Sequence, residues 1–63
     1  MLNARQQAFV NEYARGGFKN ASEAAIKAGY SEKTAAQGAS QLLKNIKVAE
    51  AIEALRKPAK EEA

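Results

Sequence analysis

Apolar residues recur along the chain at the spacing of amphipathic helices, in four segments separated by short polar or glycine-containing stretches. The first segment is predicted to begin at Asn3 and to end at Gly16-Gly17. Asn3 can cap the amides of the first helical turn, and Gln6 supplies the second member of a capping box. The apolar side of this helix carries Phe9, Val10 and Tyr13.

The second predicted helix begins at Asn20, and Glu23 follows three residues later at the capping-box spacing. We expect Gly29 to close this helix in a left-handed conformation, which glycine adopts at little cost. The face of small residues consists of Ala21, Ala24, Ala25 and Ala28. Such a face allows another helix to approach closely.

The third helix is predicted to start after the capping residue Ser31 and to run to about Lys44. Its inward arc is predicted to consist of Ala35, Ala36, Ala39, Leu42 and Leu43. The opposite face would then present Thr34, Gln37, Gln41 and Lys44.

Asn45 is placed to cap a fourth helix, which Pro58 would stop. Its apolar positions follow the i, i+3, i+4, i+7 pattern and are Val48, Ala51, Ile52 and Leu55. The sequence therefore predicts an all-α, small four-helix domain over residues 1–57. Residues 58–63 are expected to form a charged tail or the start of a linker.

The second and third helices, joined at Gly29-Tyr30-Ser31, have the layout of a helix-turn-helix. An ordinary αα-hairpin has the same spacing, so the spacing alone leaves both interpretations open. The polar face of the third helix favours the first interpretation. Gln can bond adenine bidentately, Lys can reach guanine or phosphate, and a Thr methyl can contact thymine.

Composition excludes several kinds of active site. The chain of 63 residues has no His and no Cys, and its seven acidic residues are all Glu. Zinc sites with thiolate or imidazole ligands and Cys/His nucleophile pairs are therefore excluded. The four glycines form no phosphate-binding loop. We expect a domain that is not an enzyme and has no metal or cofactor.

The formal net charge is +3, from ten Lys and Arg residues against seven Glu. Residues 1–47 hold seven of the basic residues and three of the acidic ones, so the excess lies in the first three quarters of the chain. This favours an anionic partner. The absence of cysteine and of an apolar signal segment indicates a cytosolic protein.

Two sets of residues are candidates for DNA contacts. The face of the third helix would contact bases or nearby phosphates through Lys33, Thr34, Gln37, Gln41 and Lys44. Phosphates around this helix would be lined by Arg5, Arg15, Lys19 and Lys27. The alternative for the first set is an ordinary solvated helix face, and the alternative for each member of the second set is ordinary solvated charge.

Three stretches of the sequence, between about residues 2 and 55, closely resemble the N-terminal region of bacteriophage terminase small subunits. The first is L-N-A-R-Q-Q-A-F-V-N-E-Y, which starts at Leu2. The second is N-A-S-E-A-A-I-K-A-G-Y-S-E-K-T-A, starting at Asn20, and the third is L-L-K-N-I-K-V, starting at Leu42.

The resemblance implies a DNA-binding domain that recognises the packaging site on double-stranded viral DNA in the cytoplasm of the host cell. In that family the large terminase subunit supplies the ATPase and nuclease. A central region usually forms a homo-oligomeric ring and a C-terminal segment engages the large subunit. On this basis the present chain is an excised N-terminal domain, monomeric by itself. The alternative is a helical protein-interaction module without DNA binding.

Overall fold

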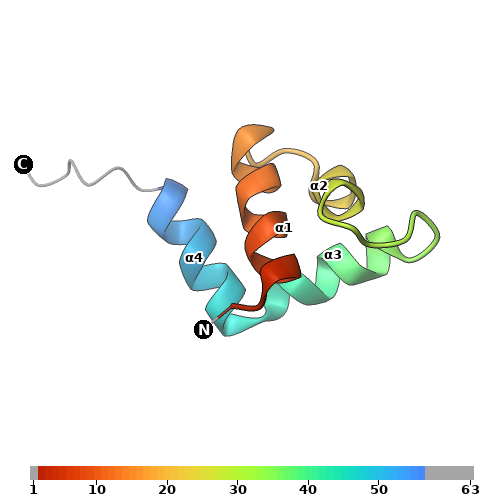
Figure 1. Cartoon of the computed structure of the whole chain (residues 1–63). Helices are drawn as coiled ribbons and strands as arrows, with labels where there is room; N and C mark the ends of the chain where they lie inside the picture. The colour runs from red at the N-terminus through yellow and green to blue at the C-terminus, as the bar shows by residue number, and fades with distance from the viewer. Residues whose placement is uncertain (1, 57–63) are drawn as a thin grey trace, which may run out of the picture.

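The computed structural model describes residues 2–56, which form four α-helices joined by short connections (Figure 1). The helices are α1 (Ala4–Arg15), α2 (Ala21–Lys27), α3 (Ala35–Lys44) and α4 (Ile46–Arg56). The prediction of a small all-α domain is confirmed. Pro58 and the 57/58 boundary lie outside the described residues.

Three asparagines begin helices as the sequence predicts. The Gln6 backbone N–H donates to Asn3 Oδ1 at 2.7 Å, and the Asn3 backbone N–H donates to Gln6 Oε1 at 3.0 Å, which completes the capping box. The Glu23 backbone N–H donates to Asn20 Oδ1 at 3.0 Å. Asn45 Oδ1 accepts from the first turn of α4. These caps satisfy amides that lack an intrahelical acceptor.

α2 ends in a Schellman motif centred on Gly29, whose φ is +111°. The Gly29 N–H donates to the Ile26 carbonyl and the Tyr30 N–H donates to the Ala25 carbonyl, both at 3.0 Å. The expected left-handed closure of this helix is confirmed.

The same motif ends α1. The Gly17 N–H donates to the Ala14 carbonyl at 3.0 Å, and the Phe18 N–H donates to the Tyr13 carbonyl at 2.9 Å. Gly17 and Phe18 have φ values of +79° and +61°. The Phe18 ring packs edge-on against Tyr13, with ring centroids 5.5 Å apart, and this contact stabilises the turn after α1.

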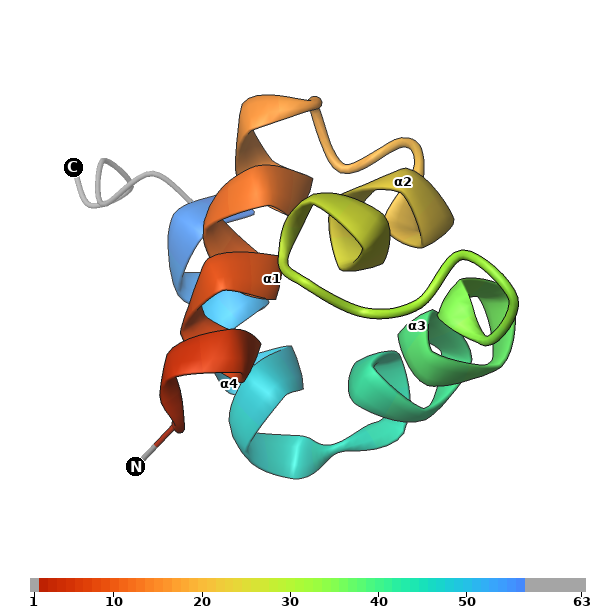
Figure 2. The ribbon, with the colours of Figure 1, turned by 45° about the vertical axis from the view of Figure 1, so that its right-hand side comes forward.

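The helices pack in a cycle, α1 with α2, α2 with α3, α3 with α4 and α4 with α1 (Figures 1 and 2). The core inside this cycle consists of Phe9, Val10, Ala24, Ala25, Ala35, Ala39, Leu42, Val48 and Ile52. The predicted small-residue face of α2 therefore supplies two core residues. Within residues 2–56, no helix is long and apolar enough to cross a membrane.

The predicted start of the third helix is wrong. α3 begins at Ala35, and residues 32–34 form a turn before it. Ser31 Oγ accepts from the Lys33 N–H at 3.2 Å, and the Ser31 carbonyl accepts from the Thr34 N–H at 3.1 Å. Ser31 therefore stabilises this turn and does not cap a helix, because its hydroxyl bonds two residues ahead.

The prediction that Ala36 and Leu43 belong to the inward arc of the third helix is also wrong. Ala36 and Leu43 are exposed, whereas Ala35, Ala39 and Leu42 are buried. On α3 the buried residues lie within a narrow arc, and Ala36 and Leu43 fall about 80° to 100° from Ala35 on one flank. Leu55 of α4 is likewise 52 % exposed, although it continues the apolar pattern of that helix.

The φ of Gly29 leads to a first prediction about stability. Gly29→Ala should lower the free energy of unfolding by about 1 to 3 kcal/mol, because amino acids that carry a Cβ rarely adopt a positive φ. Gly16→Ala is the matched control, since Gly16 also lies at a helix end but has a φ of −86° and room for a Cβ. Thermal unfolding followed by circular dichroism measures both. Equal losses would contradict the conformational explanation.

Adjacent leucines on α3 provide a second prediction. Leu42 is 7 % exposed and Leu43 is 38 % exposed. Leu42→Ala should lower the free energy of unfolding by about 2 to 5 kcal/mol, because it leaves a cavity in the core. Leu43→Ala should cost about 1 kcal/mol or less, as for other surface substitutions. Urea titrations test this order, and a larger loss for Leu43→Ala would contradict the assigned helix face.

Candidate nucleic-acid interface

The outward face of α3 carries Gln37 and Lys44. Both side chains are exposed, and both lie nearly opposite the buried positions Ala35, Ala39 and Leu42. The exposed Ser40 lies beside them, although it is not among the residues predicted from the sequence. Helical spacing is the signal that indicates Ser40, because it is about one turn from both Gln37 and Lys44.

Gln41 is exposed but lies toward one edge of this face. It lines a shallow pocket between the beginning of α1 and α3. The other residues of that pocket are Gln6, Tyr30, Gly38, Leu42 and Asn45. Gln41 is therefore nearer to α1 than Gln37 and Lys44 are.

Lys33 and Thr34 precede the helix and are exposed on the turn that leads into it. Their backbone amides donate to Ser31, and Thr34 Oγ1 also lies 3.5 Å from the Ser31 carbonyl oxygen. The local turn thus fixes their backbone. Both residues therefore lie exposed at the N-terminal end of α3.

Arg5 projects from α1 toward the turn after α2. Its Cζ lies 5.4 Å from the centroid of the Tyr30 ring, which is the geometry of a cation–π contact. A Cβ placed on Gly29 would lie 3.8 Å from Arg5 Nε. Arg5 is exposed and belongs with the α2–α3 connection, a placement that no local sequence signal indicates.

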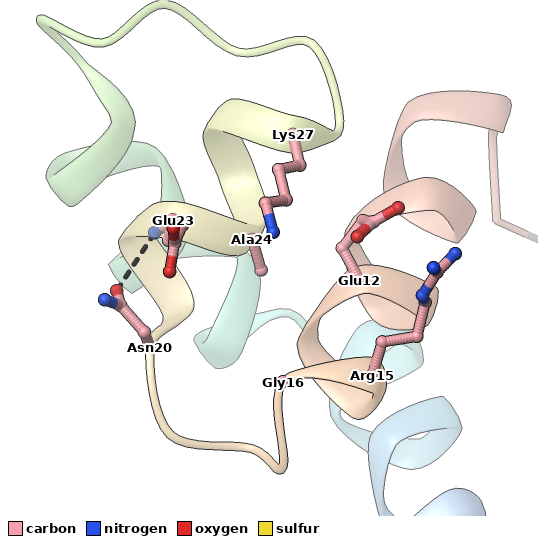
Figure 3. A pocket seen from close by; sticks show the side chains of 7 residues that line it. All are labelled: Glu12, Arg15, Gly16, Asn20, Glu23, Ala24 and Lys27. Atoms are coloured by element: carbon pink, nitrogen blue, oxygen red, sulfur yellow. Dashed lines mark hydrogen bonds between the residues drawn. The ribbon is translucent and has the colours of Figure 1, made fainter.

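Arg15 and Lys27 line a different pocket, between the end of α1 and α2 (Figure 3). Glu12, Glu23, Gly16, Asn20 and Ala24 line it with them. Two carboxylates thus share the site with the two basic side chains. The field there is weaker than the two basic residues alone would produce, because charges of opposite sign at short range offset each other.

Lys19 is exposed in the connection between α1 and α2. In Figures 1 and 2 this connection lies at the opposite end of the molecule from the junction of α3 and α4. The candidate residues therefore divide into two groups. Lys33, Thr34, Gln37, Gln41, Lys44 and Arg5 lie on or beside α3, whereas Arg15, Lys19 and Lys27 lie around the end of α1 and α2.

The chemistry of these surfaces is that of exposed hydrogen-bond donors and positive charge. Among residues 2–56 no polar or charged side chain is buried. The same part of the chain contains no group of three or more His, Cys, Asp or Glu residues arranged to hold a metal ion. Exposed Lys, Gln and Thr side chains suit contacts to phosphates and base edges.

The chain is similar in sequence to known proteins. The family model described as "Terminase small subunit" matches residues 2–63. A terminase small subunit of Staphylococcus phage 80alpha is 49% identical over 51 residues, which are 81% of this chain and 34% of the relative. The chain thus spans about a third of the length of that relative. No match was found among solved structures.

The family match also bears on catalysis. The resemblance assigns ATPase and nuclease activity to the large subunit, and the match is to the small one. This supports the expectation that the domain is not an enzyme. Since the family model covers nearly the whole sequence, the chain belongs to the terminase small subunit family.

Proposed function

We propose that this domain binds double-stranded DNA and recognises the packaging site on viral DNA for the large terminase subunit. The observation that carries the proposal is the outward face of α3. It presents Gln37 and Lys44 on one side, with Lys33 exposed on the turn that precedes the helix, while its buried side packs on α2 and α4. An α-helix presented in this way fits the major groove of B-DNA.

The arrangement of α2 and α3 is consistent with a helix-turn-helix. α2 has seven residues and packs closely against α3, and the connection between them begins with the Schellman motif at Gly29. In a helix-turn-helix the second helix enters the major groove of the DNA and the first helix crosses the DNA backbone. α3 is accordingly the proposed recognition helix.

We further propose that one copy of the domain binds DNA weakly and that the whole protein binds DNA more tightly because several copies act together. A net charge of +3 limits the electrostatic contribution of a single domain. Joining copies in a homo-oligomer raises the overall affinity without new contacts, provided that one DNA reaches several domains. The rest of the whole protein would supply that assembly and the contact with the large subunit.

A protein-interaction module is the second candidate function. The observation in its favour is a set of exposed apolar side chains, with Ile46 72 % exposed and Leu55 52 % exposed. Such side chains are common at protein interfaces but also occur singly on ordinary surfaces. Absence of DNA binding at low salt would favour this candidate.

Base recognition by α3 gives a third prediction. A duplex is first selected by the domain from a random library. Gln37→Ala should then weaken binding to this duplex by about 1 to 3 kcal/mol and leave binding to unselected DNA nearly unchanged. Gln7→Ala is the control, since Gln7 is an exposed glutamine on α1 that pairs with Asn11. Equal losses on both duplexes would assign Gln37 to positioning.

The division of the basic residues gives a fourth prediction. The slope of log K against log salt is negative, and Lys33→Gln and Lys44→Gln should each reduce its magnitude by about 0.9, the value for one phosphate contact. Arg15→Gln removes the same charge beside two carboxylates and should change the slope less. Fluorescence anisotropy over a series of salt concentrations measures these slopes. A larger effect of Arg15→Gln would move the interface to the α1–α2 pocket.

A further inference from the structure

Tyr30 occupies a defined position between three helices. It is the second residue after Ala28, the C-cap of α2, and its backbone N–H donates to the Ala25 carbonyl at 3.0 Å. Its side chain is half-buried against the core. The backbone of Tyr30 is therefore fixed by the end of α2, and this fixes the direction in which the ring leaves the chain.

The ring contacts α1 on one side and α3 on another. The guanidinium carbon of Arg5 lies 5.4 Å from the ring centroid. A Cβ added to Gly38 would lie 3.6 Å from Tyr30 Cδ2, which is ordinary van der Waals contact. The ring therefore lies close to the backbone of α3 at Gly38, at a distance that an alanine side chain there would also allow.

Arg5 has a geometry suited to an anion. A guanidinium that lies over an aromatic ring keeps its N–H groups in its own plane, where they can donate to a phosphate in a bidentate manner. Stacking also reduces the rotamer freedom that a long side chain loses on binding. The exposed Arg5 is thus held at the surface in a restricted conformation.

The surroundings of Tyr30 connect Arg5 with the recognition helix. Tyr30 lines two neighbouring depressions, one with Asn3, Ala4 and Arg5 and the other with Gln6, Gly38, Gln41, Leu42 and Asn45. A nucleic-acid backbone that passes from Gln41 toward Arg5 would cross Tyr30. Both depressions are open, and amide side chains line each of them.

We propose that Arg5 binds a DNA phosphate at the α1 edge of the α3 interface, and that Tyr30 is the residue that positions it. This proposal rests on the proposed function, because it assumes that duplex DNA lies along α3. It adds a phosphate clamp assembled from α1 and the turn after α2. Tyr30 acts through Arg5 and is a positioning residue.

The alternative role for the contact is purely structural, and the molecule offers a matched control for it. Arg56 Cζ also lies 5.4 Å from an aromatic centroid, that of Phe18. Phe18 is the second residue after the C-cap region of α1, in the same motif as Tyr30. Arg56→Gln therefore removes the same charge and the same kind of contact as Arg5→Gln, but at the end of α4.

The fifth prediction is tested with a short mixed-sequence DNA duplex by fluorescence anisotropy over a series of salt concentrations. Arg5→Gln should reduce the magnitude of the slope of log K against log salt by about 0.9, the value for one phosphate contact. Arg56→Gln should reduce it much less. Tyr30→Leu should reduce the magnitude of the slope toward that of Arg5→Gln, whereas Tyr30→Phe, which keeps the ring face, should retain the slope of the original chain.

Circular dichroism at the assay temperature shows whether each variant is folded. If Tyr30→Leu does not fold, the slopes of the two single variants Arg5→Gln and Tyr30→Phe test the clamp. An unchanged slope in Arg5→Gln, with normal binding by the original chain, would overturn the clamp but leave the proposed function intact. Equal slope changes in Arg5→Gln and Arg56→Gln would overturn the clamp in the same way. If the original chain shows no salt-dependent binding, the proposed function fails and the clamp fails with it.

Discussion

The scarcity of large side chains in the core is the constraint on which the rest of this structure depends. Within the described residues, the buried side chains larger than alanine are Phe9, Val10, Leu42, Val48 and Ile52. Helices that share so few large residues must approach closely, and the buried alanines of α2 and α3 permit this. α2 has only seven residues and would not persist alone, so its packing against α1 and α3 holds it in place. That packing uses one side of α3 and leaves its polar side outward.

The sequence predicts the ends of the helices better than their faces, for a physical reason. Asn3, Asn20 and Gly29 act through hydrogen bonds to residues a few positions away, so local sequence determines them. Ser31, like these asparagines, is a capping type of residue that precedes a predicted helix. Its hydroxyl instead accepts a hydrogen bond within a turn, and the helix begins only at Ala35. The burial of Leu42 and exposure of Leu43 depend on where α2 and α4 lie, which no local pattern contains.

The candidate site shows the same division between local and tertiary information. Gln37 and Lys44 share a face because helical spacing requires it, so their grouping is predictable. The carboxylates beside Arg15 and Lys27 come from two helices, and the sequence gives no distance between them. Net charge bounds the electrostatic attraction of the whole domain but does not show where on the surface an anion binds, since it counts a lysine beside a glutamate like an isolated one.

The ends of α1 and α2 show how one local motif can serve two structural purposes. Each helix closes in a Schellman motif whose last residue is aromatic, Phe18 or Tyr30, and each ring lies against an arginine from a helix distant in the sequence. The Phe18 contact joins the end of α4 to the end of α1. The Tyr30 contact joins the start of α1 to the turn that leads into α3. Because α3 follows that turn, a change at Tyr30 would act next to the polar face of α3, whereas a change at Phe18 would act where the end of α4 meets the end of α1.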